Sequence, residues 1–423
     1  MKSWDVIVIG SGAAGFAAAV TACCKGLSVL MLEKAGQFGG TSAISGGAVW
    51  LHDTDQARAE GKSGSAEAMK TYLRTIIGEG QYREDLAEAF VSAGREALAF
   101  LEREGAVKYS LRPLSPDYYP DEPGAVDVGR ALEVVEYDGR ELGDAFRDLR
   151  SPPPGMLLFG GMMVNRVDIQ HFLDMRRSLR SLAHCTRLLL RYARDRVKYP
   201  RGTRLAMGNA LIARNQRAVR FVNESSSYHH FASAMQDAAE NAPCFLLCDA
   251  QAMKRYGLGL ARPAPVNNDA LVAAGYLHKA DTLAALAQQL GLDAQTLSET
   301  VARYNRDAAQ GVDREFAKGG NSYNRAMGDP GHQPDACNAP LLSAPFYAIK
   351  LYTGDLGTSR GLVTTADAQV VNTEGHPIPG LYAVGNDMDS LMAGTYPGPG
   401  ITLGPGLTFG YLAACHLAQH STH

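Results

Sequence analysis

Three glycines near the start of the chain, Gly10, Gly12 and Gly15, have the spacing GxGxxG. In this spacing the first glycine permits a tight turn, the second lets the backbone approach a pyrophosphate, and the third lets a helix pack closely on a strand. Glu33 follows at about the 20-residue offset of an acid that accepts a hydrogen bond from a ribose hydroxyl. The residues therefore predict a dinucleotide site, and the acid favours an unphosphorylated ribose, as in FAD or NAD.

The elements that must position these groups lie in the same segment. The apolar run Val6–Ile9 predicts a strand, the alanine-rich residues 13–25 predict a helix, and a second strand ends at Glu33. The start of the helix, at Ala13 and Ala14, would direct free N–H groups toward phosphates. This order is far more specific than GxGxxG alone, which also occurs in ordinary strand–helix turns. Lys34, beside the acid, is included in the predicted cofactor site.

A second loop rich in glycine, serine and threonine follows, with the sequence GQFGGTSAISGGAVW over residues 36–50. Its backbone donors suit a further portion of the ligand, such as the ribityl chain and ring of a flavin. This favours FAD over NAD. The predicted contacts in this loop are Gly40, Thr41, Ser42, Ser45, Gly46 and Gly47.

The C-terminal region carries two more candidate segments. GLYAVGND, residues 380–387, predicts a short strand that ends in a turn at Gly385 and Asn386. TYPGPGITLGP, residues 395–405, predicts an irregular loop before the last helix. The start of that helix would stabilise negative charge on a bound ring. Its predicted contacts are Ile401, Thr402 and Leu403.

Composition limits the classes of partner. The 423 residues are 46% hydrophobic and 20% charged, which is ordinary for a globular protein, and a net charge of −3 gives no general attraction to nucleic acid. No apolar run has the length of a membrane helix, and the chain enters its first strand directly, so we expect a cytoplasmic protein. The seven cysteines form no CxxC pattern, and no metal site is expected.

The flavin loop carries a family resemblance. Residues 39–42 (GGTS) followed by 45–47 (SGG) resemble the loop of the FAD-dependent fumarate reductase and 3-ketosteroid dehydrogenase superfamily. The resemblance implies FAD in a Rossmann-like domain and a second domain that covers the flavin ring. The turn at 385–386 resembles the superfamily's second contact with the flavin. Some relatives attach the flavin through a histidine in this loop; there is none here, so non-covalent FAD is expected.

Within that superfamily the chain is most similar to the 3-ketosteroid dehydrogenases, the 3-oxosteroid 1-dehydrogenases in particular. Three segments carry the similarity: PDYY at 116–119, NESSSY at 223–228 and TYPGPG at 395–400. Carried over residue by residue, the similarity implies functional roles for Tyr118, Tyr228, Tyr396 and Gly400.

The resemblance implies an oxidoreductase of CH–CH groups that introduces C=C next to the ketone of a 3-oxosteroid. Hydride would leave to flavin N5 and a proton to Tyr228, with Tyr118 as its helper or proton relay. The hydroxyl of Tyr396 and the N–H of Gly400 would bind the ketone oxygen. The ring position oxidised, Δ1 or Δ4, a smaller substrate such as an oxocyclohexane carboxylate, and the electron acceptor stay open.

Other readings compete. Each tyrosine alone is better explained as a packed aromatic, since the chain has 18 of them. A fumarate-reductase-like enoate reductase would share the FAD loops but would deliver a proton through an arginine, where this chain offers Tyr396. A non-catalytic flavin- or ligand-binding relative is the third possibility.

The predicted fold class is α/β, with a Rossmann-like FAD domain that is discontinuous in sequence and a smaller α+β cap. The FAD domain is expected over residues 1–215 and 346–423, and the substrate-binding cap over 216–345. A long arginine-rich helical pattern over 167–204 is better read as a solvated face than as a contact with acidic lipid. Peripheral membrane contact is the open alternative.

One section that the family carries is missing from this sequence. Relatives have further strands of the FAD domain between segments like 208–214 and 220–225, including a turn that helps to hold the adenosine half. Here residues 214–217 (RNQR) join the two flanks directly. A parallel strand needs a crossover of about a dozen residues, so more than a loop is absent. Either the sequence omits residues that the protein has, or the protein is a deletion form with a weakened FAD site.

Overall fold

The computed structural model describes residues 3–135, 137, 139–151, 171–172, 175, 178–198, 212–214 and 216–420. The chain divides into two compact units. The first comprises Met1–Pro113, Glu122–Met207 and Thr358–His423, and the second comprises Leu114–Asp121 and Gly208–Gly357. Each unit is built around its own buried core, so each is described separately.

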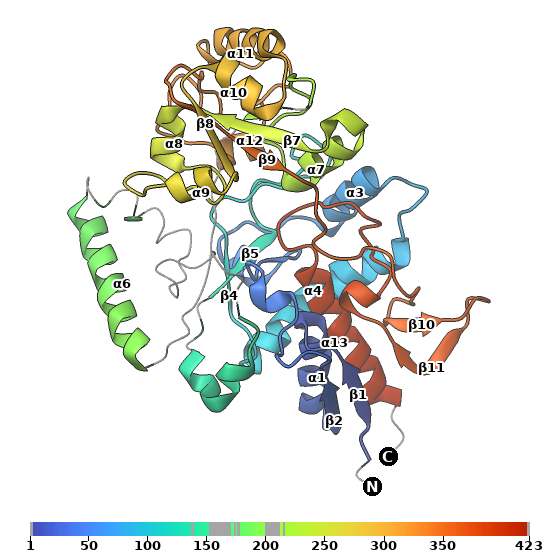
Figure 1. Cartoon of the computed structure of the whole chain (residues 1–423). Helices are drawn as coiled ribbons and strands as arrows, with labels where there is room; N and C mark the ends of the chain where they lie inside the picture. Colours follow the sequence, from blue (N-terminus) through green and yellow to red (C-terminus); the bar gives the residue numbers. More distant parts are fainter. Residues whose placement is uncertain are drawn as a thin grey trace. The chain divides into compact units, whose positions relative to one another are not determined.

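The first unit is built on a parallel strand pair and two helices. Strands β1 (Val6–Ile9) and β2 (Val29–Leu32) pair in parallel, joined by α1 (Ala13–Cys24). The last helix, α13 (Leu403–His420), packs along α1, so both ends of the chain meet in one layer (Figure 1). Small residues such as Ala22 and Ala414 are buried between them, which allows close helix packing. The predicted strand–helix–strand unit and last helix are confirmed.

The rest of the first unit surrounds this layer. An antiparallel sheet has the order β3-β5-β4, and β10 pairs with β11. α4 packs against both α3 and α13. The bounds are η1 (Ser42–Ile44), β3 (Val49–Trp50), α2 (Asp55–Ala59), α3 (Ala66–Ile77), α4 (Glu84–Arg103), β4 (Tyr109–Leu111), β5 (Ala131–Val134), η2 (Gly139–Asp148), α6 (Leu179–Lys198), β10 (Gln369–Val371), β11 (Pro377–Tyr382) and η4 (Gly385–Asp387).

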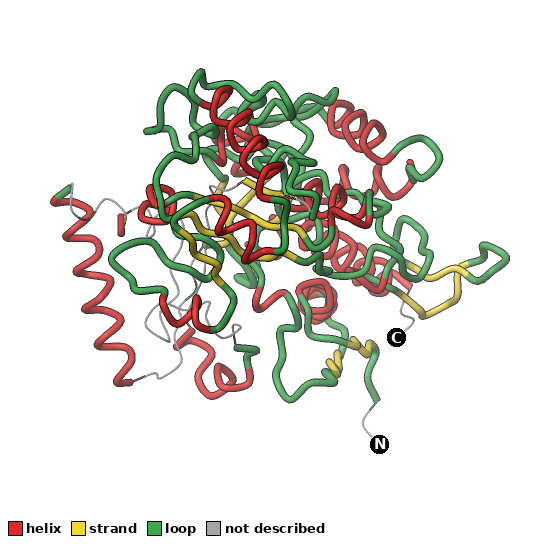
Figure 2. The backbone as a smooth tube through the Cα atoms, turned by 45° about the horizontal axis from the view of Figure 1, so that its top comes forward, coloured by secondary structure: helices red, strands yellow, loops and turns green. Residues whose placement is uncertain are grey.

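The second unit is an antiparallel sheet with helices. Its strands have the order β6-β7-β9-β8, and they form the larger group of yellow segments in Figure 2. Leu247 of β7, Leu286 of α10 and Val301 of α11 are buried in one core. The bounds are β6 (Ile212–Arg214), α7 (Tyr228–Gln236), η3 (Ala239–Asn241), β7 (Cys244–Cys248), α8 (Ala250–Tyr256), α9 (Asp269–Ala273), β8 (Leu277–Ala280), α10 (Leu283–Leu290), α11 (Ala294–Ala308), α12 (Ser322–Met327) and β9 (Phe346–Leu351).

The boundaries of the units differ from those expected from the sequence. We expected the FAD domain to resume at residue 346, but β9 pairs antiparallel with both β7 and β8, so its residues group with the second unit. Residues 114–121 also group with the second unit, although they lie far from it in sequence. Both changes come from long-range pairing and packing, which local patterns do not reveal. The mixed α/β fold class itself is confirmed.

The arginine-rich pattern forms a helix within the part of the chain that the structure describes. We expected a helix over 167–204; residues 152–170 and 199–211 lie outside the described part, and α6 covers Leu179–Lys198. Arg180, Arg187 and Arg191 are exposed, as a solvated face requires. Leu179 and Leu190 of the same helix are exposed too, at 85% and 66%. Among the described residues, no helix combines the length and hydropathy needed to cross a bilayer.

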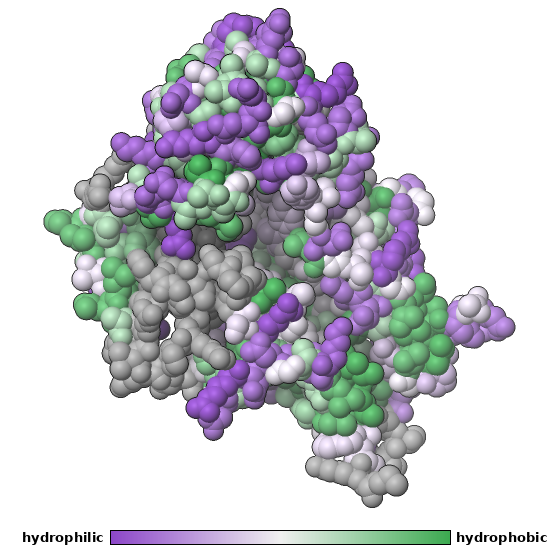
Figure 3. All heavy atoms as spheres, in the orientation of Figure 1, coloured by the Kyte–Doolittle hydropathy of each residue, from purple (hydrophilic) through white to green (hydrophobic). Residues whose placement is uncertain are grey.

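The parallel strand pair leaves apolar side chains uncovered. Ile7 and Ile9 of β1 are 57% and 81% exposed, and Leu32 of β2 is 47% exposed. Figure 3 shows apolar surface where β1 lies in Figure 1. Strands of parallel sheets are normally buried on both faces. Within the described residues β1 and β2 pair only with each other, so the surface that further strands or a covering layer would bury is open.

Candidate active site

The GxGxxG turn has the geometry that its sequence predicts. Gly10 has φ of +95°, and its N–H donates to the carbonyl of Leu32 over 2.8 Å, which fixes the turn between the two strands. A Cβ on Gly15 would lie 2.2 Å from the Gly10 carbonyl oxygen, so only glycine lets α1 approach the turn this closely. Gly12 is the N-cap of α1, and because glycine has no side chain it makes no side-chain hydrogen bond to the first N–H groups of the helix.

Glu33 is held as a carboxylate beside this turn. Its Oε2 accepts hydrogen bonds from the hydroxyl and the N–H of Ser11, at 2.5 and 3.0 Å, and its Oε1 accepts from the N–H of Ala35 at 2.9 Å. The Ser11 hydroxyl and then these backbone donors lower the pKa of Glu33 to about 2. The group is therefore an ionised acceptor at neutral pH, as recognition of a ribose hydroxyl requires.

Ser11 is a contributor that the sequence analysis missed. It is 1% exposed, and its hydroxyl also accepts from the N–H of Gly39, so it ties the acid to the flavin loop. Ser11 occupies the first variable position of GxGxxG. A hydroxyl at that position is the sequence feature from which its contact with the acid could have been predicted. The link shows why turn, acid and loop form one site.

The flavin loop folds over the start of α1. The hydroxyl of Ser42 accepts from the N–H of Ala13 at 3.0 Å, and a Cβ on Gly40 would lie 3.6 Å from the Cα of Gly12. Ser45 accepts from the N–H of Gly47, which has φ of +68°. The predicted contacts Gly40, Thr41, Ser42, Ser45, Gly46 and Gly47 therefore lie on one loop at the helix N-terminus, with Lys34 exposed beside Glu33.

The C-terminal turn meets the same helix start. A Cβ on Gly385, which has φ of +66°, would lie 2.8 Å from the Cβ of Ala14, and one on Gly406 would lie 3.3 Å from it. The predicted strand over 380–387 is in fact β11, which ends at Tyr382, followed by the helical turn η4 that contains Gly385 and Asn386. The two predicted halves of the cofactor site therefore come together in the first unit.

These residues fit a bound FAD. A Cβ on Gly10 would meet nothing within 4 Å, and one on Gly12 would meet only the Ser42 hydroxyl at 3.7 Å, so the turn leaves room for a ligand. The helix start supplies N–H donors for a pyrophosphate, and Glu33 supplies an acceptor for a ribose. The donor set is that of a dinucleotide site.

The TYPGPG loop is held rigidly by two buried aromatic residues. The hydroxyl of Tyr72 donates to the carbonyl of Pro397 over 2.8 Å, and a Cβ on Gly398 would lie 2.5 Å from Nε1 of Trp50. Gly400 has φ of +105°, its Cβ position lies 2.6 Å from Val49, and its carbonyl accepts from the N–H of Trp50. The backbone at Gly400 is thereby fixed.

The elements around this loop match the sequence prediction. Tyr396, in the same loop as Gly400, is half-buried. The predicted helix start at Ile401, Thr402 and Leu403 is confirmed, since α13 begins at Leu403. Its first turn is closed by the N–H of Gly404, which donates to the carbonyl of Gly400 over 2.9 Å.

Two of the predicted tyrosines are in contact in the second unit. Tyr228 is the first residue of α7, whose N-cap Ser227 accepts from the N–H of His230. The ring of Tyr118 packs edge-on against that of Tyr228, with centroids 5.6 Å apart. Tyr228 is 49% exposed, so its phenol is not buried in the core. Residues 220–227, which precede α7, form neither helix nor strand.

A third tyrosine joins this cluster. The ring of Tyr323, on α12, lies edge-on to Tyr118 with centroids 5.1 Å apart. Burial raises the pKa of Tyr323 to about 12, so it is a neutral phenol at physiological pH. The sequence analysis missed it, because a single tyrosine in a chain of 18 carries no local signal. Tyr118, Tyr228 and Tyr323 are called the tyrosine cluster below.

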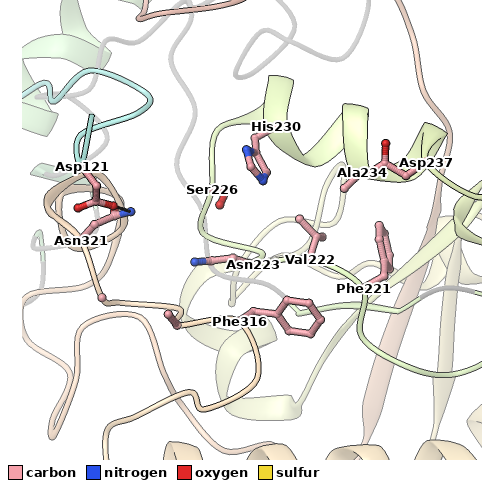
Figure 4. A pocket seen from close by; sticks show the side chains of 12 residues that line it. Asp121, Phe221, Val222, Asn223, Ser226, His230, Ala234, Asp237, Phe316 and Asn321 are labelled. Carbon is pink, nitrogen blue, oxygen red and sulfur yellow. Dashed lines mark hydrogen bonds between the residues drawn. The ribbon is translucent and has the colours of Figure 1, made fainter. Parts of the chain in front are cut away.

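A pocket of about 530 Å³ lies next to the turn at residues 223–227, which precedes α7 (Figure 4). Asn223 and Ser226 of the turn and His230 of α7 line it. Among the described residues, its charged lining side chains are Asp121 and Asp237, both acidic. The remaining lining residues are Phe221, Val222, Ala234, Phe316, Ala317, Gly320 and Asn321.

Comparison with known proteins agrees with this site. The family of FAD binding domains (FAD_binding_2) matches residues 5–217 and 197–403. The 4-oxocyclohex-2-ene-1-carboxylate 5-dehydrogenase of Sinomonas cyclohexanicum is 30% identical, over 98% of this chain and 94% of its own. The 3-oxosteroid 1-dehydrogenase of Mycolicibacterium smegmatis is 28% identical, over 99% of this chain and 97% of its own.

A solved structure is similar over the whole chain. It is the 3-ketosteroid delta1-dehydrogenase from Sterolibacterium denitrificans in complex with 1,4-androstadiene-3,17-dione. The TM-score is 0.88 at 27% identity, and all of both chains is covered. The fold predicted from the resemblance is therefore confirmed.

The comparisons also locate the missing section. The two pieces of the family match overlap at residues 197–217, around the junction noted in the sequence. The alignment with the Sinomonas relative spans 555 residues, more than the 423 of this chain, so that relative carries internal sequence that this chain lacks. Asn215 lies outside the described residues, so a break in the chain at the junction stays a prediction.

The family match, the full-length relative at 30% identity and the glycine turn with its acid all agree. The chain is an FAD-binding oxidoreductase and belongs to the 3-ketosteroid dehydrogenase and fumarate reductase flavoprotein superfamily.

Proposed function

We propose that this protein dehydrogenates a cyclic ketone, introducing C=C next to the carbonyl, with a 3-oxosteroid or a smaller oxocyclohexane as substrate. The observation that carries the proposal is the contact of Tyr118 with Tyr228, with centroids 5.6 Å apart. It pairs the two tyrosines to which the resemblance gives the proton-transfer roles. Full-length similarity to two dehydrogenases named for cyclic ketone substrates supports it.

The reaction needs a base on the carbon next to the carbonyl. In our proposal the Tyr228 phenolate takes that proton, and the Tyr118 hydroxyl stabilises the phenolate or passes the proton on. A free tyrosine has a pKa near 10, so a hydrogen-bonding neighbour is required for Tyr228 to act near neutral pH. The exposed fraction of Tyr228, 49%, leaves its ring accessible to a substrate.

The ketone oxygen needs donors aimed at the charge that develops as the proton leaves. We assign this role to the Tyr396 hydroxyl and the Gly400 N–H. The rigid packing of the Gly400 backbone on Val49 and Trp50 supports the role, because a fixed donor needs no reorganisation during the reaction. Bound FAD would supply the hydride acceptor.

FAD is held non-covalently in this proposal, because residues 36–50 contain no histidine. Denaturation followed by filtration should release all of the yellow colour into the filtrate. Colour that stays with the precipitated chain would contradict it.

Anaerobic mixing of the purified flavoprotein with a ketone tests the function without an external electron acceptor. A 3-ketosteroid and 4-oxocyclohexanecarboxylate are mixed separately with the oxidised protein, and flavin absorbance is followed. Bleaching by either supports the proposal and tells which substrate class is preferred. If neither bleaches the flavin, while fumarate reoxidises chemically reduced protein, the function is that of an enoate reductase. Purification without bound flavin, even with FAD added, would favour a non-catalytic relative.

A further inference from the structure

A buried asparagine beside the tyrosine cluster has hydrogen-bond partners at both polar atoms of its side chain. Asn324, on α12, is 1% exposed. Its Oδ1 accepts from the N–H of Gly319 at 3.1 Å and from Nδ2 of Asn223 at 2.9 Å. Its Nδ2 donates to the carbonyl of Ser225 at 2.9 Å. Because the backbone N–H of Gly319 can only donate, the atom of the Asn324 side chain that faces it is the oxygen, and this fixes the orientation of the amide.

These bonds fix the turn that leads into Tyr228. Asn223 uses its other amide atom, Oδ1, to accept from the N–H of Ser225, and its carbonyl accepts from the N–H of Ser226. Ser227 then caps α7, of which Tyr228 is the first residue. Asn324 therefore contacts the turn at both Asn223 and Ser225. These two contacts hold the turn in place and so fix the position of Tyr228.

The same helix also contacts the other tyrosine of the pair. Tyr323 precedes Asn324 on α12, and its ring packs edge-on against Tyr118. α12 thus touches Tyr118 through one residue and the turn before Tyr228 through the next. Asn321 caps α12 by accepting from the N–H of Asn324, which holds the helix start in place.

A buried ion cluster anchors the beginning of the turn. Arg220 pairs with Glu224 at 2.7 Å and with Asp313 at 2.6 Å, and all three side chains are at most 1% exposed. Burial alone would lower the pKa of Arg220, but the two carboxylates hold it above its usual value, so the cluster stays ionised. The turn is therefore held by charge at Arg220 and Glu224, and by Asn324 at Asn223 and Ser225.

We propose that Asn324 is a positioning residue for the reaction: it holds the turn so that Tyr228 stays packed on Tyr118. The proposal rests on the proposed function for its kinetic part. An aspartate at this position would keep shape and volume but replace the Nδ2 donor by an acceptor facing the Ser225 carbonyl. An alanine would leave the amide of Asn223 and the carbonyl of Ser225 without their buried partner.

Two variants and a matched control test this. Asn324→Asp removes the hydrogen bond to Ser225, and Asn324→Ala removes the hydrogen bonds to both Asn223 and Ser225. Asn305→Ala removes a comparable link in the same unit, where the Asn305 amide exchanges two hydrogen bonds with the backbone of Leu341, at 2.8 and 2.9 Å. Hydrogen–deuterium exchange of the peptide over 222–231 is measured for all three as purified. Single-turnover flavin reduction by the better ketone is measured in parallel.

Both Asn324 variants should exchange faster than wild type in this peptide, at the amides of Ser225 and Ser226. They should lower the limiting rate of flavin reduction about tenfold, with the dissociation constant for the ketone changed less than about twofold, because misplacement of a reacting group affects the chemical step. Asn305→Ala should change neither the exchange nor the reduction rate. Unchanged exchange in the Asn324 variants, or an equal loss of the reduction rate in the control, would overturn the proposal. If wild type reduces no ketone, the proposed function fails, and the exchange comparison still decides whether Asn324 holds the turn.

Discussion

At the residue scale, Tyr228 carries the proposed proton transfer. Its ring packs on Tyr118, which in turn packs on Tyr323, and burial raises the pKa of Tyr323 to about 12. Tyr228→Phe keeps the ring that packs on Tyr118 and removes only the hydroxyl. We expect the rate of anaerobic flavin reduction to fall at least about a hundredfold, the usual scale for loss of a general base.

The control for that variant is Tyr276→Phe, in the same unit, whose hydroxyl accepts from the N–H of Leu260 and belongs to no proposed site. The flavin of this control should be reduced by the ketone at the wild-type rate. If the rate of flavin reduction in Tyr228→Phe is within about threefold of the wild-type rate, Tyr228 is not the base.

Glu33 gives a second prediction at this scale. Its pKa is lowered from 4.5 to about 2, so its stabilising hydrogen bonds are fully present above about pH 4.5 and are lost as the pH falls through about 2. FAD affinity should therefore not vary with the ionisation of Glu33 between about pH 5 and about pH 8. Glu33→Gln should weaken FAD binding about tenfold, since an ionised acceptor forms stronger hydrogen bonds than an amide. Fluorescence titration of apoprotein with FAD measures both effects.

At the element scale, close packing of α1 on the glycine turn is required. Gly15→Ala would place a methyl group 2.2 Å from the Gly10 carbonyl oxygen, where the contact is with backbone and cannot relax cheaply. We expect about 1–3 kcal/mol lower stability, the usual cost of overpacking, together with loss of bound FAD. Gly80→Ala is the control, because its Cβ would meet nothing within 4 Å and its φ is not positive. Equal melting temperatures for the two variants would contradict this packing.

The elements also show what the sequence could predict. The turn at Gly10–Gly15, the acid at Glu33 and the last helix follow from local spacing, and the structure has them where they were expected. β9 was expected in the FAD domain, whereas it pairs with β7 and β8, strands that are distant from it in sequence and that local patterns do not connect to it. Tyr323 and Asn324 have no motif, and only their packing reveals them.

At the scale of the whole molecule, the junction at residues 214–217 explains an unusual surface. Relatives carry internal sequence that this chain lacks, and the parallel pair β1–β2 leaves Ile9 81% exposed. Large exposed apolar patches promote association. The chain should therefore self-associate as its concentration rises, measured by sedimentation velocity, and Ile9→Thr should reduce that association without lowering the melting temperature. A monomeric wild type over the same concentrations would contradict this prediction.

The same junction predicts a weakened cofactor site. The Rossmann-like turn and flavin loop are present, whereas the turn to which the family resemblance assigns the adenosine half lies in the section absent at 214–217. Purified protein should hold less than one FAD per chain. Added FAD should raise the melting temperature in proportion to the logarithm of its concentration once it exceeds the dissociation constant. A full complement of FAD that survives extensive dialysis would show that the absent section is not needed for binding.

The central claim is that this flavoprotein takes hydride and proton from a cyclic ketone. Stopped-flow anaerobic mixing of FAD-saturated protein with a 3-ketosteroid or 4-oxocyclohexanecarboxylate tests it most directly, with Tyr228→Phe as the paired variant. We expect loss of oxidised-flavin absorbance in wild type and a much slower loss in the variant. A wild-type spectrum that does not change with either ketone, in protein shown to contain bound FAD, would contradict it.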